Sequence, residues 1–374
     1  MLCIKMRIHK TLQQTNVRLL IIAVFMVILI TRIVTEIKQQ QTFIYTTMDS
    51  ITQQAPRLTR IGKELDFDYN SCPPSSVMLN STQLNTAPLH DNCPHVFIIG
   101  ARKGGTTAMY QYLSHHPDFG GVRLKKGPAS GETFYFSNYY GRKPWSEYVS
   151  EFPTDKMSGD STVGNLLNCH VPQRLYSSCG RTAKVVVLLR DPLERFQSSF
   201  RLRVRSKRKG YNDQVHISDI VDQQIDRFYL HAVSSRDNVN MDDLSSHPNK
   251  LKCMHGEDRN MVYAGLYYVH LHNWLCNFPA ENIIILNTEQ FRDNSVKSLA
   301  EVMEFVDLQP LEDHKMQQVT SVLYNYGGRL EDELSFRKLS VSDRKKLMPI
   351  YEPFNKKLFQ LLNWNTVKWN KISE

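Results

Sequence analysis

Two patterns that often identify an enzyme are missing from this chain. No C-x-x-C occurs, and histidines near cysteines in the sequence, such as His170 and His255, lack the spacing of zinc ligands. We therefore expect no metal. The Walker A sequence is also missing, because Lys103 precedes two glycines rather than a serine or threonine. This absence disfavours a P-loop nucleotide kinase or hydrolase, which we keep as an alternative function.

The composition is that of an ordinary globular protein with an excess of positive charge. The 374 residues are 41% hydrophobic and 22% charged, which is enough to bury one large core or two modest ones. The net charge is +9 and the isoelectric point is about 9.1. Such a charge favours an anionic partner, either nucleic acid, acidic lipid or acidic polysaccharide.

One hydrophobic run near the N-terminus predicts a membrane anchor. Leu19 to Ile30 is apolar throughout, and residues 17–34 reach the roughly 17 residues that a minimal span requires. Basic residues precede the run, so the positive-inside rule places residues 1–16 in the cytosol and the rest of the chain in a lumen. A cleaved signal peptide is the alternative, although no small-x-small cleavage site follows. We expect a single-pass type II membrane protein.

Residues 35–92 are predicted to form a luminal stem. They are rich in polar residues and proline, lack sustained periodicity and contain a glycosylation sequon at Asn80. The cysteines beyond the anchor form an even set that could make three disulfides: Cys72, Cys93, Cys169, Cys179, Cys253 and Cys276. Six cysteines allow about 15 pairings, of which we expect the one between sequence neighbours, namely Cys72 with Cys93, Cys169 with Cys179 and Cys253 with Cys276.

Residues 93–374 alternate apolar strand candidates with helical patterns. Strands are expected over 96–99, 183–189 and 282–286, and helices from Thr106 and over 144–152, 194–205, 265–277 and 295–306. This alternation predicts a single α/β domain with a parallel, doubly wound sheet. Ligands of such sheets bind beyond the carboxyl ends of the strands.

The stretch Val96 to His116, VFIIGARKGGTTAMYQYLSHH, predicts a phosphate-binding turn. A strand, a glycine-rich basic turn and a helix start together present backbone N–H groups to an anion. Lys103 adds a positive charge, and Thr106 and Thr107 add hydroxyl donors. An ordinary tight turn is the alternative. A second basic turn, at Arg190, follows the strand predicted over 183–189.

Together, GARKGGTTAMYQYLSHHP and LLRDPLERFQSSF resemble the two cofactor-binding signatures of sulfotransferases that use 3′-phosphoadenosine 5′-phosphosulfate (PAPS). With the anchor and stem, the chain is similar to Golgi carbohydrate sulfotransferases from about residue 93 to its end. GLYYVHLHNWL and MEFVDLQPL look most like the N-acetylgalactosamine 4-sulfate 6-O-sulfotransferase type, with heparan sulfate N- and 3-O-sulfotransferases close behind. The resemblance implies a P-loop-like sulfotransferase fold, a luminal catalytic domain in the Golgi and metal-independent sulfation of a glycosaminoglycan hydroxyl.

The same resemblance implies roles for individual residues. Lys103 would stabilise charge on the departing phosphate, and Glu132, in GETFYF, would take the proton of the acceptor hydroxyl. A solvated loop carboxylate is the alternative for Glu132. Arg190 and Ser198 would hold the 3′-phosphate. The alternative for Arg190 is that it caps a helix or pairs with Asp191, and the alternative for Ser198 is an ordinary surface serine. The donor-binding set is Arg102, Lys103, Gly104, Gly105, Thr106, Thr107, Arg190 and Ser198.

A further donor contact is implied near the C-terminus. NYGGR, at residues 325–329, resembles the Lys-Gly-Arg element that closes over PAPS in heparan sulfate enzymes, which points to Gly328 and Arg329. The cysteine pair that precedes this element in those relatives is absent, since no cysteine follows Cys276.

A polyanionic acceptor is expected from the residues around these sites. Asp160, in SGDSTVGNLL, is a second carboxylate predicted to contact the acceptor, although this stretch departs from the Lys-Ser/Thr-Pro wording of heparan sulfate enzymes. The basic residues predicted to contact the acceptor are Arg123, Lys125, Lys126, Arg201, Arg203 and Arg205. The alternative is that they only form solvated charged faces. Nucleic acid is not expected as a partner, because a luminal enzyme does not meet it. Two possibilities stay open. The chain could form a homodimer, and it could be a catalytically inactive glycan-binding protein of the same fold.

Overall fold

The computed structural model describes residues 58–60, 63–65, 67–74, 76, 90, 92–122, 131–233, 239–254, 260–322, 338–364, 367 and 369. The predicted cytosolic tail, the anchor over 17–34 and the sequon at Asn80 lie outside these residues. Within the described ranges, no helix combines the length and the hydropathy needed to cross a membrane.

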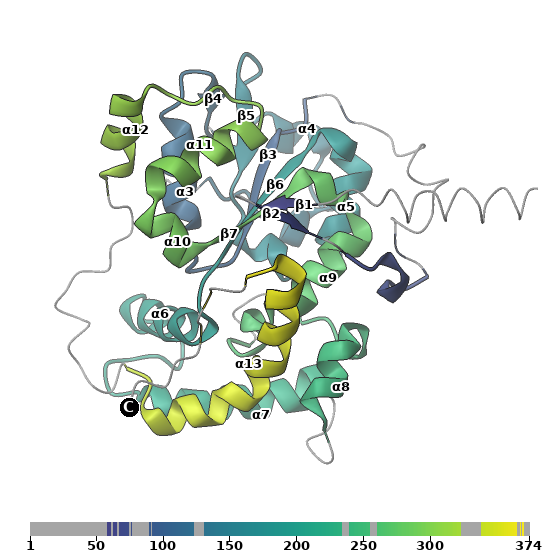
Figure 1. The fold of residues 1–374 in the computed structure, drawn as a ribbon, viewed down its shortest axis with the longest axis vertical. Helices are drawn as coiled ribbons and strands as arrows, with labels where there is room; N and C mark the ends of the chain where they lie inside the picture. Colours follow the sequence, from purple (N-terminus) through teal and green to yellow (C-terminus); the bar gives the residue numbers. More distant parts are fainter. Residues whose placement is uncertain are drawn as a thin grey trace, which may run out of the picture. The chain divides into compact units, whose positions relative to one another are not determined.

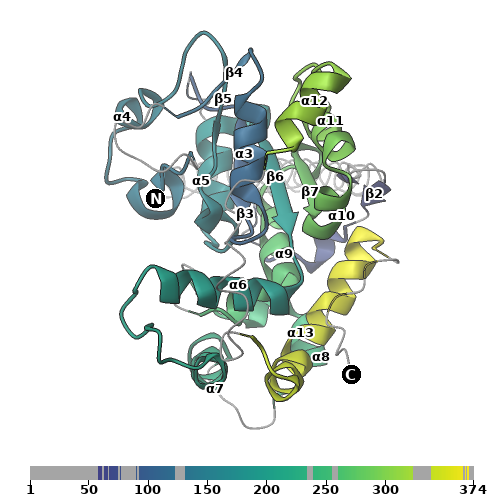
Figure 2. The ribbon, with the colours of Figure 1, turned by 90° about the vertical axis from the view of Figure 1, so that its left-hand side faces the viewer.

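A parallel sheet of five strands forms the centre of the described region, in the order β4-β5-β3-β6-β7 (Figures 1 and 2). The strands are β3 (Val96–Gly100), β4 (Phe119–Gly120), β5 (Met157–Asp160), β6 (Lys184–Leu189) and β7 (Ile283–Asn287). Every residue of β3 and β7 is buried, as expected for parallel strands covered on both faces. The predicted parallel α/β sheet is therefore confirmed.

Helices cover both faces of the sheet. Val185 and Val187 of β6 pack towards α5 (Val171–Cys179) and α9 (Tyr267–Asn277), whereas the alternate residue Val186 packs towards the other side. That side is covered by α3 (Thr106–Ser114), α11 (Ser295–Phe305) and α12 (Asp313–Thr320). Two further short helices are α4 (Trp145–Val149) and α10 (Thr288–Asp293).

A second apolar core lies among helices beyond the sheet. It is formed by α6 (Pro192–Arg205), α7 (Ile217–Phe228), α8 (Met241–Ser246), α13 (Val341–Leu362) and part of α9 (Figure 1). Pro192 occupies the first turn of α6, where its fixed φ angle suits a helix start. Since α6 directly follows β6, this helical layer borders the carboxyl ends of the strands.

Part of the predicted stem belongs to the folded unit. A short antiparallel pair, β1 (Leu58–Arg60) and β2 (Lys63–Leu65), precedes Phe67, which is buried in the core beside the sheet. Cys72 is then bonded to Cys276 of α9. The folded region therefore begins before residue 93.

The disulfides join cysteines that are distant in sequence, so the predicted pairing of neighbours is wrong. The bonds are Cys72–Cys276, Cys93–Cys179 and Cys169–Cys253. Cys93 precedes β3, and Cys179 ends the helix that leads into β6. Because β3 and β6 are adjacent parallel strands, the residues that enter them meet at the same edge. Sheet order therefore sets this pairing.

Candidate functional site

The turns that follow three strands are joined at the carboxyl edge of the sheet. The backbone N–H of Ala101, after β3, donates to the carbonyl oxygen of Leu188 in β6 (2.7 Å). The hydroxyl of Thr288, after β7, donates to the carbonyl oxygen of Gly104 (2.7 Å). Residues 101–105 are thus held between β6 and α10, at the edge where parallel sheets bind ligands.

The glycine-rich turn runs close against β6 and has an unusual backbone. A Cβ on Gly104 would lie 2.5 Å from the carbonyl oxygen of Leu188, so only glycine allows this close approach. Lys103 and Gly105 both adopt left-handed φ angles, of 71° and 95°. Helix α3 begins at Thr106, and the first N–H groups of a helix have no acceptor within the helix. Lys103 lies two residues before Gly105, the N-cap of α3, so the turn leads directly into the start of this helix.

Of the two predicted donor contacts after β6, Arg190 lies between β6 and α6, and Ser198 lies on α6. Asp191 caps the helix by accepting from the N–H of Leu193 (2.8 Å), so its carboxylate supports the cap. The guanidinium of Arg190 lies 4.0 Å from the Glu194 carboxylate. Ser198 is half-buried and follows Glu194 by four residues, which places both on the same face. Arg190 therefore lies beside a carboxylate that shares a helix face with Ser198.

The basic block at the end of α6 divides between two faces. Arg201 and Arg205 follow Ser198 by three and seven residues, so they continue its face, and Arg205 is exposed. Arg203 is only 6% exposed, and its guanidinium lies 5.6 Å from the ring centre of Tyr211. The predicted acceptor contact of Arg203 is contradicted, because the helix turns this side chain into the protein. Other predicted contacts lie outside the described residues: Arg123, Lys125, Lys126, Gly328 and Arg329.

The segment of Glu132 contacts two elements near the glycine-rich turn. Gly131 has φ of 70°, and a Cβ there would lie 2.2 Å from the ring of Tyr110 on α3. The Glu132 carboxylate accepts from the N–H of Val163 (3.4 Å). The carbonyl oxygen of Val163 in turn lies 3.2 Å from the Cβ position of Gly100, where the turn begins. Glu132 is half-buried, which argues against a freely solvated loop carboxylate.

Asp160, at the end of β5, is not an acceptor contact. Its side chain is 1% exposed, and its oxygens accept hydrogen bonds from Thr133, Tyr148 and Thr162. Burial raises the pKa of the Asp160 carboxyl, and these hydrogen bonds oppose the rise. Burial, followed by the charge of Asp160, also raises the pKa of Tyr148 well above its usual value. This burial argues against the predicted contact, because protein donors already bond both oxygens of the carboxylate.

The sequence did not single out several residues of this edge. Thr288 holds Gly104, and Glu289 accepts from the N–H of Asp191 (3.3 Å) and from the indole of Trp369 (3.2 Å). Both follow β7 directly, so polar residues at the end of a predicted strand were the available signal. Thr162 carried no comparable signal, since its importance depends on a partner 28 or more residues away.

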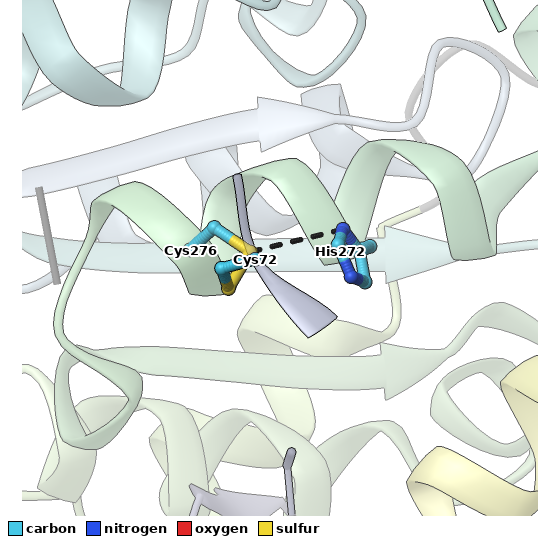
Figure 3. A group of neighbouring side chains, drawn as sticks. All are labelled: Cys72, His272 and Cys276. Atoms are coloured by element: carbon cyan, nitrogen blue, oxygen red, sulfur yellow. Dashed lines mark hydrogen bonds between the residues drawn. A yellow bond between two sulfur atoms is a disulfide. The ribbon is translucent and has the colours of Figure 1, made fainter. Parts of the chain in front are cut away.

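A separate cluster joins the N-terminal segment to α9 (Figure 3). Among the residues that the structure describes, Cys72, His272 and Cys276 bring three atoms of metal-ligand type within 4.8 Å. The two sulfurs are bonded to each other, so neither is a thiolate, and His272 Nδ1 lies 3.7 Å from Cys276 Sγ. Burial lowers the pKa of His272 to about 4. The cluster therefore acts as a covalent attachment with a neutral histidine beside it.

Comparison with known proteins gives a match to the sulfotransferase domain family over residues 93–349. A bifunctional heparan sulfate N-deacetylase/N-sulfotransferase of Drosophila melanogaster is 28% identical over 246 residues, covering 60% of this chain and 20% of the relative. Carbohydrate sulfotransferase 15 of Rattus norvegicus is 25% identical over 334 residues, covering 74% of this chain and 54% of the relative. Heparan sulfate glucosamine 3-O-sulfotransferase 3B1 of Homo sapiens is 22% identical over 290 residues, covering 72% of this chain and 63% of the relative.

The chain thus spans less than two thirds of each of these relatives. Among solved structures, a sulfotransferase from Alicyclobacillus acidocaldarius superposes with a TM-score of 0.51 at 19% identity, covering 72% of this chain and 96% of that one. This likeness supports the fold.

Proposed function

The chain belongs to the sulfotransferase domain family, and from that premise we propose that it transfers a sulfuryl group from PAPS to a hydroxyl of a glycosaminoglycan. The observation that carries the proposal is the joining of the turns after β3, β6 and β7 at one edge. These bonds support a donor site there, because they tie the glycine-rich turn to β6 and α10, and Asp191, the neighbour of Arg190, to Glu289 of α10.

The residues of this edge match the chemistry of the donor. When bound, PAPS supplies a sulfuryl group activated by a phosphate leaving group. The N–H groups at the start of α3 and the hydroxyls of Thr106 and Thr107 hold an anion at the 5′ end. Lys103 stabilises the negative charge that grows there during transfer. Arg190, a forked donor, and Ser198 hold the 3′-phosphate on the face of α6.

Glu132 acts on the other side of the transferred group. Its carboxylate takes the proton of the acceptor hydroxyl as the new bond to sulfur forms. This role is supported by the hydrogen bond from the N–H of Val163 to the Glu132 carboxylate, because the carbonyl oxygen of Val163 lies 3.2 Å from the Cβ position of Gly100. No step in this scheme requires a metal.

A glycosaminoglycan is the acceptor class that we favour. Arg201 and Arg205 continue the face of Ser198 and offer positive charge to an anionic chain. The 6-hydroxyl of N-acetylgalactosamine in chondroitin or dermatan sulfate is our first choice, on the likeness of GLYYVHLHNWL and MEFVDLQPL stated above. Heparan sulfate is the alternative, favoured by relatives whose names include that polymer. We also propose a type II anchor and a Golgi luminal site of action.

Product analysis tests this function. The full chain is incubated with labelled PAPS and separate chondroitin, dermatan and heparan chains, and the products are digested to disaccharides. We expect label in chondroitin or dermatan, at the 6-position of the galactosamine unit. Label in heparan would show that the acceptor is heparan sulfate, the alternative polymer. Absence of label from every chain, in a preparation that binds heparin, would favour an inactive glycan-binding protein.

A further inference from the structure

A buried carboxylate lies directly behind the segment that carries Glu132. Asp160 Oδ1 accepts from the backbone N–H and the hydroxyl of Thr162 (2.9 and 2.6 Å). Oδ2 accepts from the hydroxyls of Thr133 and Tyr148 (2.5 and 3.2 Å). Asp160 therefore receives four hydrogen bonds, which is about the full accepting capacity of a carboxylate.

Two threonines extend these bonds to the backbone around Glu132. While Thr162 Oγ1 donates to Asp160, it accepts from the N–H groups of Thr133 and Phe134 (3.0 Å each). Thr133 Oγ1 donates to Asp160 and accepts from the N–H of Tyr135 (3.2 Å). Both hydroxyl protons point at the carboxylate, so both oxygens are left as acceptors. The charge of Asp160 thus sets the direction of each bond.

The held segment has a conformation that needs such support. Phe134 has φ of 58°, an unfavourable left-handed angle for a bulky residue, and it is 36% exposed despite its apolar ring. The N–H of Ser161 also donates to the carbonyl oxygen of Gly131 (2.8 Å). Glu132 therefore sits in a segment that is tied on both sides to the turn after β5. Strained segments of this kind are found at functional sites.

We propose that Asp160 is a positioning residue that fixes the backbone of Thr133, Phe134 and Tyr135, and thereby orients Glu132 towards the acceptor hydroxyl. This role rests on the proposed function of Glu132. Asp160 contacts neither donor nor acceptor. It acts through Thr162 and Thr133, so removing either the carboxylate or the Thr162 hydroxyl has the same consequence.

A double-mutant cycle in the full chain tests the proposal. The variants are Asp160→Asn, Thr162→Val, Glu132→Gln and the two combinations with Glu132→Gln. We expect Asp160→Asn and Thr162→Val each to lower kcat at least 10-fold while leaving the affinity for 3′-phosphoadenosine 5′-phosphate unchanged. In the Glu132→Gln background, neither change should lower kcat further, because the group that they orient is already absent.

A purely structural role would instead give additive losses, and this result would overturn the proposal. Thr320→Val is the matched control, because the Thr320 hydroxyl bonds only to the carbonyls of its own helix among the described contacts. It should leave kcat unchanged. Tyr148→Phe removes one of the four donors while both threonines stay in place, and should cost less than 3-fold.

Amide hydrogen exchange gives a readout that does not depend on activity. The N–H groups of Thr133, Phe134 and Tyr135 should be protected in the parent and lose protection in Asp160→Asn and Thr162→Val, with other strands unaffected. Unchanged protection would refute the positioning role. If protection changes as expected while the parent transfers no sulfate, the proposed function fails, but Asp160 still fixes the backbone of Thr133, Phe134 and Tyr135.

Discussion

Replacing Lys103 by methionine is expected to lower kcat by about 10²–10³-fold, the range seen when one preorganised group that stabilises transition-state charge is removed. Methionine keeps the Cβ and an unbranched side chain only one atom shorter, so the left-handed backbone at φ 71° carries similar strain in both proteins. The loss therefore reports the ammonium charge. Steady-state kinetics with saturating acceptor measures it.

Two comparisons complete this prediction. Lys103→Arg keeps the charge in a different shape and should recover part of the activity. Lys297→Met changes a lysine that is 78% exposed on α11, and should leave kcat at the parent value. An unchanged kcat in Lys103→Met would remove this residue from the reaction and weaken the assignment of the glycine-rich turn to the reactive end of the donor.

Replacing Glu132 by glutamine is expected to lower kcat by about 10²–10⁴-fold, the usual contribution of a positioned general base. Glutamine has nearly the same size and can still accept from the N–H of Val163, so the loss reports the missing base. The parent rate should fall in acid as the carboxylate becomes protonated. Glu132→Gln should lack this acid limb in its pH–rate profile.

Glu147→Gln provides the matched control for this substitution. Glu147 lies on α4, its side chain is 48% exposed, and it pairs with Lys143 at 2.5 Å. It should retain the parent rate and pH profile. Transfer by Glu132→Gln at the parent rate would show that another group takes the proton, and Asp160 is too deeply buried to do so.

The central sheet could be predicted because its strands carry local signals. The runs over 96–99, 183–189 and 282–286 are apolar and stand between helical patterns, and β3, β6 and β7 coincide with them within one or two residues. The family prediction is confirmed by the match over residues 93–349. Both predictions rest on short, continuous stretches of sequence that can be recognised without knowing the fold.

What the sequence did not reveal depends on contacts between distant residues. Cys72 pairs with Cys276 across 204 residues because the N-terminal segment returns to α9. Arg203 looked like its neighbours in a basic run, yet helix periodicity turns it towards Tyr211. Asp160 looked like an acceptor contact, and only the fold shows that Thr133 and Thr162 enclose it. The roles of Lys103, Glu132, Arg190 and Ser198 stay predictions that experiments must test.

Binding of 3′-phosphoadenosine 5′-phosphate tests the donor site most directly, because it requires no choice of acceptor. Calorimetry with the full chain should give one site per chain. Arg190→Met should weaken binding by about 10–100-fold, the cost of losing a charge-assisted pair with a phosphate. Arg227→Met, which changes an exposed arginine on α7, should not alter the affinity. Absence of binding by the parent, or equal affinity in parent and Arg190→Met, would contradict the donor site proposed at this edge.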